Sequence, residues 1–118
     1  MKKTVFVVEI DWVNESGDSD CTTFVFDSIE KAEEQLRKEV LGELDSRKGD
    51  TLYYEKDESA PMLEELLKQF KESDFDFAET DDDDCYVIEI SPTYFSCYRQ
   101  GYYSSDHINV RIKERNVE

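Results

Sequence analysis

A run of four aspartates is the sharpest chemical feature of the sequence: Asp81, Asp82, Asp83 and Asp84. Adjacent carboxylates repel one another, so the run must be solvated, neutralised by a cation or met by a basic partner. An EF-hand calcium loop needs alternating oxygen ligands, a glycine and a late glutamate, and neither residues 74–85 nor residues 81–92 supply that spacing. A solvated loop is the first interpretation and a partner-binding surface the second, and we expect no specific metal site.

His107, the only histidine, is a candidate general acid or base, because histidine exchanges protons most readily near neutral pH. It could also activate the thiol of Cys21 or Cys97 as a nucleophile. No nucleophile turn surrounds either cysteine, and the pattern of the last strand places His107 on its outward side with Asn109 and Arg111. We therefore expect an ordinary strand histidine and no catalytic residue.

The three cysteines, Cys21, Cys85 and Cys97, are odd in number, and none has the CxxC spacing of a zinc or redox motif. Three reduced thiols in a cytoplasmic protein are the simplest interpretation. The N-terminal apolar run is too short for a signal peptide or a membrane span, because Glu9 and Asp11 interrupt it. The four glycines form neither a GxGxxG turn nor a GxxxxGK[ST] phosphate loop, so no cofactor is expected.

Aromatic residues gather between residues 94 and 103. Tyr94 and Tyr98 are predicted on one face of a strand and Phe95 on the other, so part of this group belongs to the core. Tyr102 and Tyr103 follow a glycine in a predicted loop, where aromatic side chains either pack locally or serve as anchors at a protein interface.

The charge of the chain excludes one class of partner. Among 118 residues there are 30 acidic and 14 basic side chains, a net charge of −16, so no basic surface is available for nucleic acid or for an anionic membrane. The excess is uneven, because residues 50–91 hold fifteen acids and three bases, a net −12. The length fits one domain, and seven phenylalanines and seven tyrosines supply the apolar bulk that a disordered acidic chain lacks.

Alternating apolar residues predict strands at both ends of the chain. Residues 5–12 and 21–26 flank a polar turn and should form an antiparallel pair. Residues 85–90 and 93–98 should form a second pair across a tight turn at Ser91-Pro92, and residues 107–113 the last strand.

Two helices are expected between these pairs. Asp27 precedes Glu30 by the spacing of a capping box and starts the first helix, which Gly49 should end. Ser59 before Ala60-Pro61 starts the second helix, which should run to about Lys71. We interpret residues 50–54, between the helices, as a loop.

The predicted fold is a single α+β domain over residues 1–118, with a mainly antiparallel sheet of about five strands in the order β-β-α-α-β-β-β and two helices packed on one face. The expected core joins both strand pairs to the helices: Phe6, Val8, Ile10, Phe24, Phe26, Ile29, Leu36, Val40, Leu66, Ile88, Val110 and Ile112.

Two hypotheses for function follow. The first is a non-catalytic domain whose acidic surface engages a basic protein, in the extreme case by imitating the charge of nucleic acid and inhibiting a nucleic-acid-binding protein. The second is a small enzyme or ligand-binding domain with a pocket near His107 and the tyrosine-rich loop. The first hypothesis assigns partner binding to nine residues: Asp74, Asp76, Glu79, Asp81, Asp82, Asp83, Asp84, Tyr102 and Tyr103.

Overall fold

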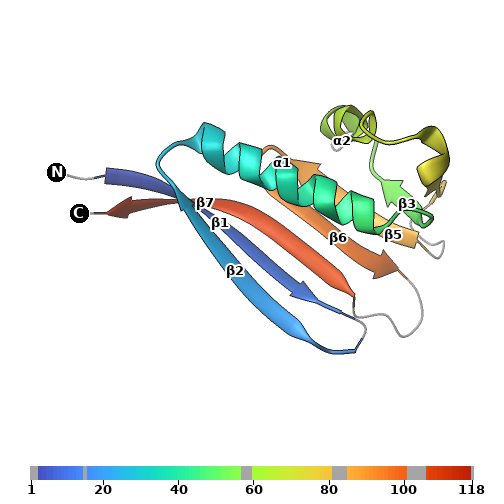
Figure 1. The fold of residues 1–118 in the computed structure, drawn as a ribbon, viewed down its shortest axis with the longest axis horizontal. Coiled ribbons are helices and arrows are strands. Elements are labelled where there is room, and N and C mark those ends of the chain that lie inside the picture. The colour runs from blue at the N-terminus through green and yellow to red at the C-terminus, as the bar shows by residue number, and fades with distance from the viewer. Residues whose placement is uncertain (1–2, 15, 57–59, 81–84, 101–105, 118) are drawn as a thin grey trace.

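The structure is a computed structural model that describes residues 3–14, 16–56, 60–80, 85–100 and 106–117. It is an α+β fold with one mixed sheet of seven strands, in the order β2-β1-β7-β6-β5-β3-β4, and two α-helices (Figure 1). The prediction of an α+β fold with two helices is confirmed. The predicted number of about five strands and the order β-β-α-α-β-β-β are wrong, because two short strands extend the sheet with parallel pairing.

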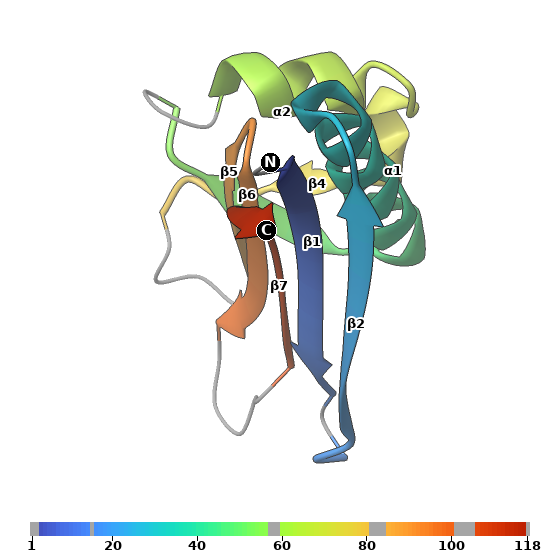
Figure 2. The same cartoon turned by 90° about the vertical axis from the view of Figure 1, so that its left-hand side faces the viewer.

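Three long strands form one half of the sheet. β1 (Lys3–Val13) pairs antiparallel with β2 (Ser19–Phe26), as predicted, across a turn in which Gly17 has φ +86°. β7 (His107–Val117) pairs antiparallel with β1 along its whole length. The first and last strands are therefore neighbours, and the two ends of the described chain lie side by side (Figure 2).

The other half contains the second predicted strand pair. β5 (Cys85–Ser91) and β6 (Tyr94–Gln100) form an antiparallel hairpin, and β6 also pairs with β7. The register confirms the predicted alternation, because Phe95 and Cys97 lie in the core while Tyr94 and Tyr98 are partly exposed on the other face.

Two short strands correct the sequence analysis. β3 (Thr51–Tyr54), which was predicted to be a loop, pairs parallel with β5 and with β4 (Asp76–Phe77). Four residues and two residues are too few to show a period of two, and their partners are distant in the chain. Burial of Leu52 explains the position of β3, since an apolar side chain with no exposed surface fixes it against the core.

The N-cap of helix α1 (Ile29–Ser46) lies one residue later than the predicted cap. Ser28 is the N-cap, with an extended backbone and a hydroxyl that accepts the N–H of Lys31 at 3.3 Å, so the predicted capping box on Asp27 is wrong. Asp27 instead pairs with the Lys31 ammonium at 3.0 Å. The helix buries a four-residue repeat against the sheet: Ala32, Leu36, Val40 and Leu44.

Helix α2 (Ala60–Leu67) is shorter than predicted, and its predicted cap, Ser59, lies outside the described residues. Its last turn tightens, because Gln69 and Phe70 donate their N–H groups to carbonyls only three residues earlier. A 3₁₀ turn, η1 (Glu72–Asp74), then leads into β4. α2 lies beside α1, since a groove of about 360 Å³ is lined by residues of both helices and the turn after α2.

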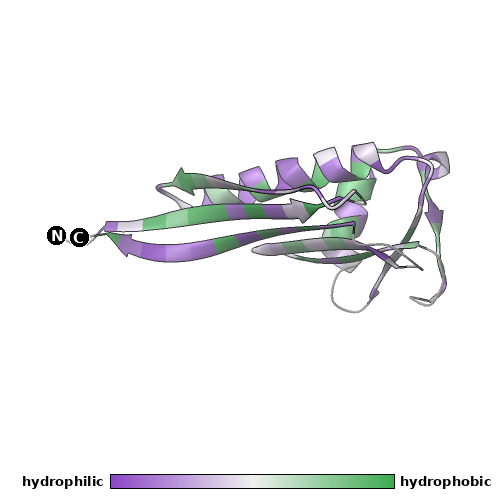
Figure 3. Ribbon diagram, turned by 90° about the horizontal axis from the view of Figure 1, so that it is seen from below, coloured by the Kyte–Doolittle hydropathy of each residue, from purple (hydrophilic) through white to green (hydrophobic). Residues whose placement is uncertain are grey.

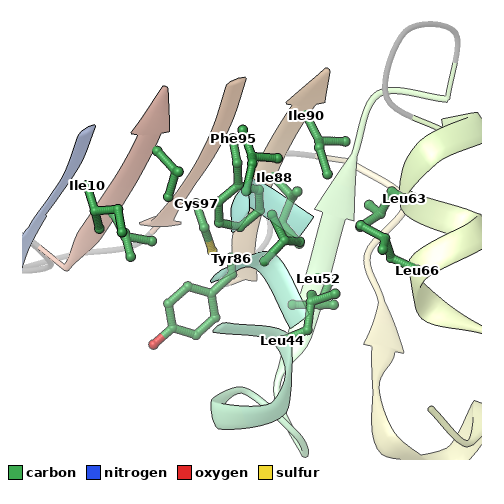
Figure 4. Packing of buried hydrophobic residues seen from close by; sticks show 14 of the residues in the cluster. Ile10, Leu44, Leu52, Leu63, Leu66, Tyr86, Ile88, Ile90, Phe95 and Cys97 are labelled. Atoms are coloured by element: carbon green, nitrogen blue, oxygen red, sulfur yellow. The ribbon is translucent and has the colours of Figure 1, made fainter. Parts of the chain in front are cut away.

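The core is one cluster between the sheet and the helices (Figure 4). Most residues of the predicted core are buried in it or packed against it. Phe24 and Ile29 are the exceptions, because Phe24 is 36% exposed on edge strand β2 and Ile29 stays outside the cluster at the start of α1. Seen along the sheet, α1 lies on one side, and no helix of the described residues covers the opposite side (Figure 3).

Leu36→Ala should lower the free energy of unfolding by about 2–5 kcal/mol, because a fully buried leucine leaves a cavity beneath α1. Denaturant unfolding measures the change. Lys38→Ala, on the exposed side of the same helix, is the control and should change the stability by less than about 0.5 kcal/mol. Equal stabilities for the two variants would contradict the packing of α1.

Candidate partner-binding surface at the β3–β4 edge

The structure places three of the nine predicted site residues at one edge of the sheet. Asp74 ends η1, Asp76 lies in β4 and Glu79 follows β4. The aspartate run 81–84 and the tyrosines at 102 and 103 lie outside the described residues. The described part of the predicted site is therefore the β3–β4 edge.

Asp74 has a structural role at this edge. Its carboxylate accepts the N–H of Lys71 at 3.0 Å, and its carbonyl accepts the N–H of Gly49 at 2.6 Å. Gly49 has φ +92°, a left-handed conformation that favours glycine, so this contact ties the turn after α1 to η1. Asp76 and Glu79, by contrast, are exposed carboxylates on either side of Phe77.

Phe77 is the most exposed aromatic side chain of the described residues, at 50%. Its ring meets the ring of Tyr54 edge-on, with centroids 6.1 Å apart. Edge-on contacts of this kind stabilise aromatic pairs, so Tyr54 holds Phe77 in place at the edge although half of it faces solvent.

Two hollows adjoin this aromatic pair, and both are lined by Tyr54 and Phe77. The first, of about 530 Å³, lies along β3 and the residues after β4, and the second, of about 640 Å³, lies between the edge and the end of α2. Leu67 and Phe70 give the second hollow an apolar wall. Together the hollows form a surface with an aromatic ridge in the middle, which we call the Phe77 surface: residues 52–56, 64, 67, 68, 70–72 and 77–79.

Charged side chains form part of the Phe77 surface. Glu55 and Glu79 line the first hollow, and Glu64 and Glu72 line the second. The Tyr54 hydroxyl donates to Glu64 at 3.3 Å, and burial together with this carboxylate raises the pKa of Tyr54, so the phenol stays neutral. An uncharged aromatic floor with carboxylates at its margin suits a cationic side chain with an apolar stem.

The three bases of residues 50–91 all line these hollows: Lys56, Lys68 and Lys71. The described residues from 50 to 80 contain eight acids and these three bases, a net −5. The remaining excess of residues 50–91 belongs to Glu89 and to acids outside the described residues. The Phe77 surface is thus mixed in charge, with four glutamates and three lysines, and it lies in the most acidic third of the chain.

His107 begins β7 on the sheet face opposite to the core, as predicted. Tyr98 is its neighbour on β6, while Cys97 is the neighbour of Ile108 and points into the core. Because successive side chains of a strand point to opposite faces, the sheet separates His107 from the Cys97 thiol. The structure therefore does not form a nucleophile pair from these two residues.

Sequence reasoning missed a buried polar cluster at the C-terminal end of α1. Arg47 is only 8% exposed, and its guanidinium pairs with Glu43 and lies over the ring of Tyr86, 4.7 Å from the centroid. Arg99 approaches the same ring at 5.2 Å. The Tyr86 hydroxyl donates to Asp106 at 3.0 Å, so the cluster connects α1, β5, β6 and the residue before β7.

The polar cluster is internally compensated. Arg47 pairs with both carboxylates of the cluster, Glu43 and Asp106, and it also donates to the carbonyl of Glu43 at 3.1 Å. Among the buried side-chain nitrogen and oxygen atoms of the described cluster, the Nε atom of Arg47 is the one without a hydrogen-bond partner. A lone arginine after an amphipathic helix carries no sequence signal for burial, since Tyr86 and Asp106, which it contacts besides Glu43, lie about 40 to 60 residues later.

Cys97 lies beside this cluster with 1% of its surface exposed. Burial raises the pKa of its thiol to about 12, and the nearby Arg47 offsets only part of that effect. The thiol is therefore protonated near neutral pH, and a protonated thiol is a poor nucleophile and a poor metal ligand.

Within the described parts of the chain, no three His, Cys, Asp or Glu side chains are grouped closely enough to bind a metal ion. No helix in those parts combines the length and apolar character that crossing a membrane requires. Comparison with protein-family models, with curated proteins and with solved structures finds no match.

The buried thiol of Cys97 predicts a loss of stability at alkaline pH. Its pKa rises from an ordinary 9.0 to about 12 on folding, so between these values the unfolded chain releases a proton that the folded chain retains. The stabilisation is complete below about pH 9 and is lost as pH rises toward about 12.

Urea unfolding at several pH values between about 8 and 11 measures this slope. Cys97→Ala should show a shallower decline than the wild type, whereas Cys21→Ala, at an exposed cysteine, should keep the wild-type decline. Raised pKa values of Tyr54 and Tyr86 account for the part of the slope that remains. Equal slopes for the wild type and Cys97→Ala would contradict the prediction.

Proposed function

We propose that this protein is a non-catalytic, cytoplasmic binding domain whose acidic surface engages a basic protein. The observation that carries the proposal is a half-exposed aromatic side chain, Phe77, between two hollows in the most acidic third of the chain. Large exposed aromatic side chains beside hollows are common anchors of protein interfaces, and the surrounding carboxylates select basic partners.

The acidic charge and the exposed aromatic side chains have different roles in the proposed complex. The net charge of −16 attracts a basic partner over long range and accelerates its approach, but charge at a solvated surface adds little lasting affinity. Phe77 and Tyr54 supply apolar contact that is lost only when the complex separates. A lysine or arginine of the partner can lie along the Tyr54 ring and place its charge beside Glu64.

We also assign the aspartate run to the proposed partner-binding surface because of its place in the chain. Asp81–Asp84 follow Glu79 within five residues, and Glu79 lines the first hollow. Surfaces that hold phosphates with lysine and arginine are the most basic that proteins present, so we propose a nucleic-acid-binding protein as the partner. Tyr102 and Tyr103 are proposed as further aromatic contacts.

A partner is recovered by pull-down from a bacterial lysate at low salt, and its affinity is then measured by calorimetry at several salt concentrations. The double variant Asp76→Asn, Glu79→Gln should weaken binding and lower its salt dependence, because two carboxylates beside Phe77 are removed. The matched control Glu34→Gln, Glu114→Gln removes the same charge at exposed positions on α1 and β7. Equal effects of the two double variants would indicate a general effect of net charge. That result would contradict binding at the Phe77 surface.

Phe77→Ser separates apolar contact from charge. It should weaken binding by about tenfold or more and leave the salt dependence unchanged, because no charge is altered. Replacing Asp81–Asp84 together with asparagine should have the opposite signature, a reduced salt dependence. Competition by duplex DNA tests the class of partner, since a nucleic-acid-binding surface cannot bind duplex DNA and this protein at the same time.

The alternative, an enzyme or ligand-binding domain with a pocket near His107, makes a different prediction. Under the proposed function, His107→Ala should leave partner binding unchanged, because His107 lies on β7, four strands from β4 in the sheet. Calorimetry measures the affinity of the His107→Ala variant for the same partner. Loss of binding in a His107→Ala protein that still folds would favour the alternative.

A further inference from the structure

The second edge of the sheet is β2, and its whole length except Phe26 is exposed. The pairing of β2 with β1 has a continuous register over eight residue pairs, with no bulge. Phe24 and Val25 on this strand are 36% and 62% exposed, which makes Val25 the most exposed large apolar residue of the described chain. Long, regular edge strands of this kind are sites where a further strand can pair.

The direction of the free backbone groups follows from the hairpin. Asn14 donates its N–H to the carbonyl of Asp18 at 2.9 Å, so the even-numbered residues of β2 exchange hydrogen bonds with β1. The odd-numbered residues, including Cys21, Thr23 and Val25, therefore direct their N–H and C=O groups away from the sheet. The N–H of Cys21 confirms this direction, because it donates to the carboxylate of Asp20 at 2.7 Å instead of to β1.

The β2 edge is protected against pairing with a further strand at one end only. The Asp20 carboxylate occupies the N–H of Cys21, while residues 21–26 contain no charged side chain, no proline and no glycine. Charged residues and prolines are the usual protection of an exposed edge. In a chain with 37% charged residues, an uncharged stretch of β-branched and aromatic side chains at an edge leaves Thr23 and Val25 open to pairing.

Charge decides which occupant fits this edge. A basic partner finds no carboxylate between residues 21 and 26, so this stretch does not suit the partner proposed for the Phe77 surface. A second copy of the chain, which also carries −16, must avoid placing carboxylates opposite one another. The uncharged stretch of β2 meets that requirement.

We propose that two copies of this protein associate through their β2 edges, antiparallel about a two-fold axis at Phe24. In this register Thr23 of one copy pairs with Val25 of the other, which forms four backbone hydrogen bonds around the axis and leaves the Asp20 contact intact. Phe24 lies opposite its own copy and extends the existing stack of Phe24 on Phe26, whose centroids are 6.5 Å apart. Asp20 of one copy and Asp27 of the other point to opposite sides of the joined sheet, since even-numbered and odd-numbered side chains of a strand point to opposite faces.

Sedimentation equilibrium from low micromolar to millimolar concentration tests the proposal with the protein itself. The wild type should form a dimer, and the dimer should persist or tighten as salt rises, because screening weakens the repulsion between two acidic chains. Binding of a basic partner must instead weaken with salt, so failure of the dimer and failure of the proposed function are separate results. A wild type that stays monomeric throughout overturns the proposal.

Two variants locate the interface. Thr23→Pro removes an outward N–H without disturbing the bonds to β1, and it should weaken dimerisation by about tenfold or more, since two of the four bonds at the axis are lost. Phe24→Lys places two lysines opposite one another and should do the same. The matched control Phe77→Lys makes the same change at the other edge and should leave the dimer intact while it disrupts partner binding.

Circular dichroism establishes that each variant is folded. If both β2 variants are folded and still dimerise like the wild type, the dimer uses another surface and the proposal is wrong. The same conclusion follows if Phe77→Lys alone abolishes dimerisation.

Discussion

The structure depends on the burial of one helix stripe against one face of a wide sheet. Seven strands spaced about 4.8 Å apart span roughly 29 Å between the outermost strands, whereas two helices side by side cover about 20–24 Å. α1 buries Leu36 and Val40 over the central strands, and α2 adds Leu63 and Leu66 to the same core. The edges of the sheet therefore extend beyond the helices, which leaves Phe24 and Phe77 exposed at opposite ends of the strand order.

The two exposed edges differ in chemistry. The β4 edge is short and contains Phe77 between hollows that are lined by four glutamates and three lysines, within the most acidic third of the chain. The apolar contact and the acidic surroundings are the reason why we propose a basic partner there. The β2 edge is long, regular and uncharged from residue 21 to residue 26, so it suits another strand. With the interfaces at opposite edges of one sheet, a dimer joined at β2 would present two Phe77 surfaces and gain affinity for a partner with two basic sites.

The polar cluster around Arg47 holds these parts in register. It links the end of α1 to β5, β6 and Asp106, and the contact between Gly49 and Asp74 extends the connection to η1. Removing one partner of a buried ion pair costs more than the pair itself contributes, because the other charge is left without compensation. The turn between α1 and β3, the strand that lines the Phe77 surface, is therefore anchored by charged groups as well as by the apolar core.

Sequence alone determined the long elements and the distribution of charge. The alternation in residues 5–12 and the four-residue repeat of α1 are local periodicities, and they place Val8, Ile10, Leu36 and Val40 in the core without knowledge of their partners. The acidic excess of residues 50–91 is likewise a property of the chain itself.

Only the tertiary structure decided the short strands, the burial of Arg47 and the surroundings of Phe77. β3 and β4 form because β3 pairs with the edge of β5, a strand that begins more than 30 residues after β3. A local stretch of sequence does not contain both partners of that pairing. The strand pattern predicts Phe24 in the core, yet the limited width of the helix layer leaves it at an edge. Local pattern determines which face of an element is apolar, whereas the position of the element among its neighbours determines whether that face is covered.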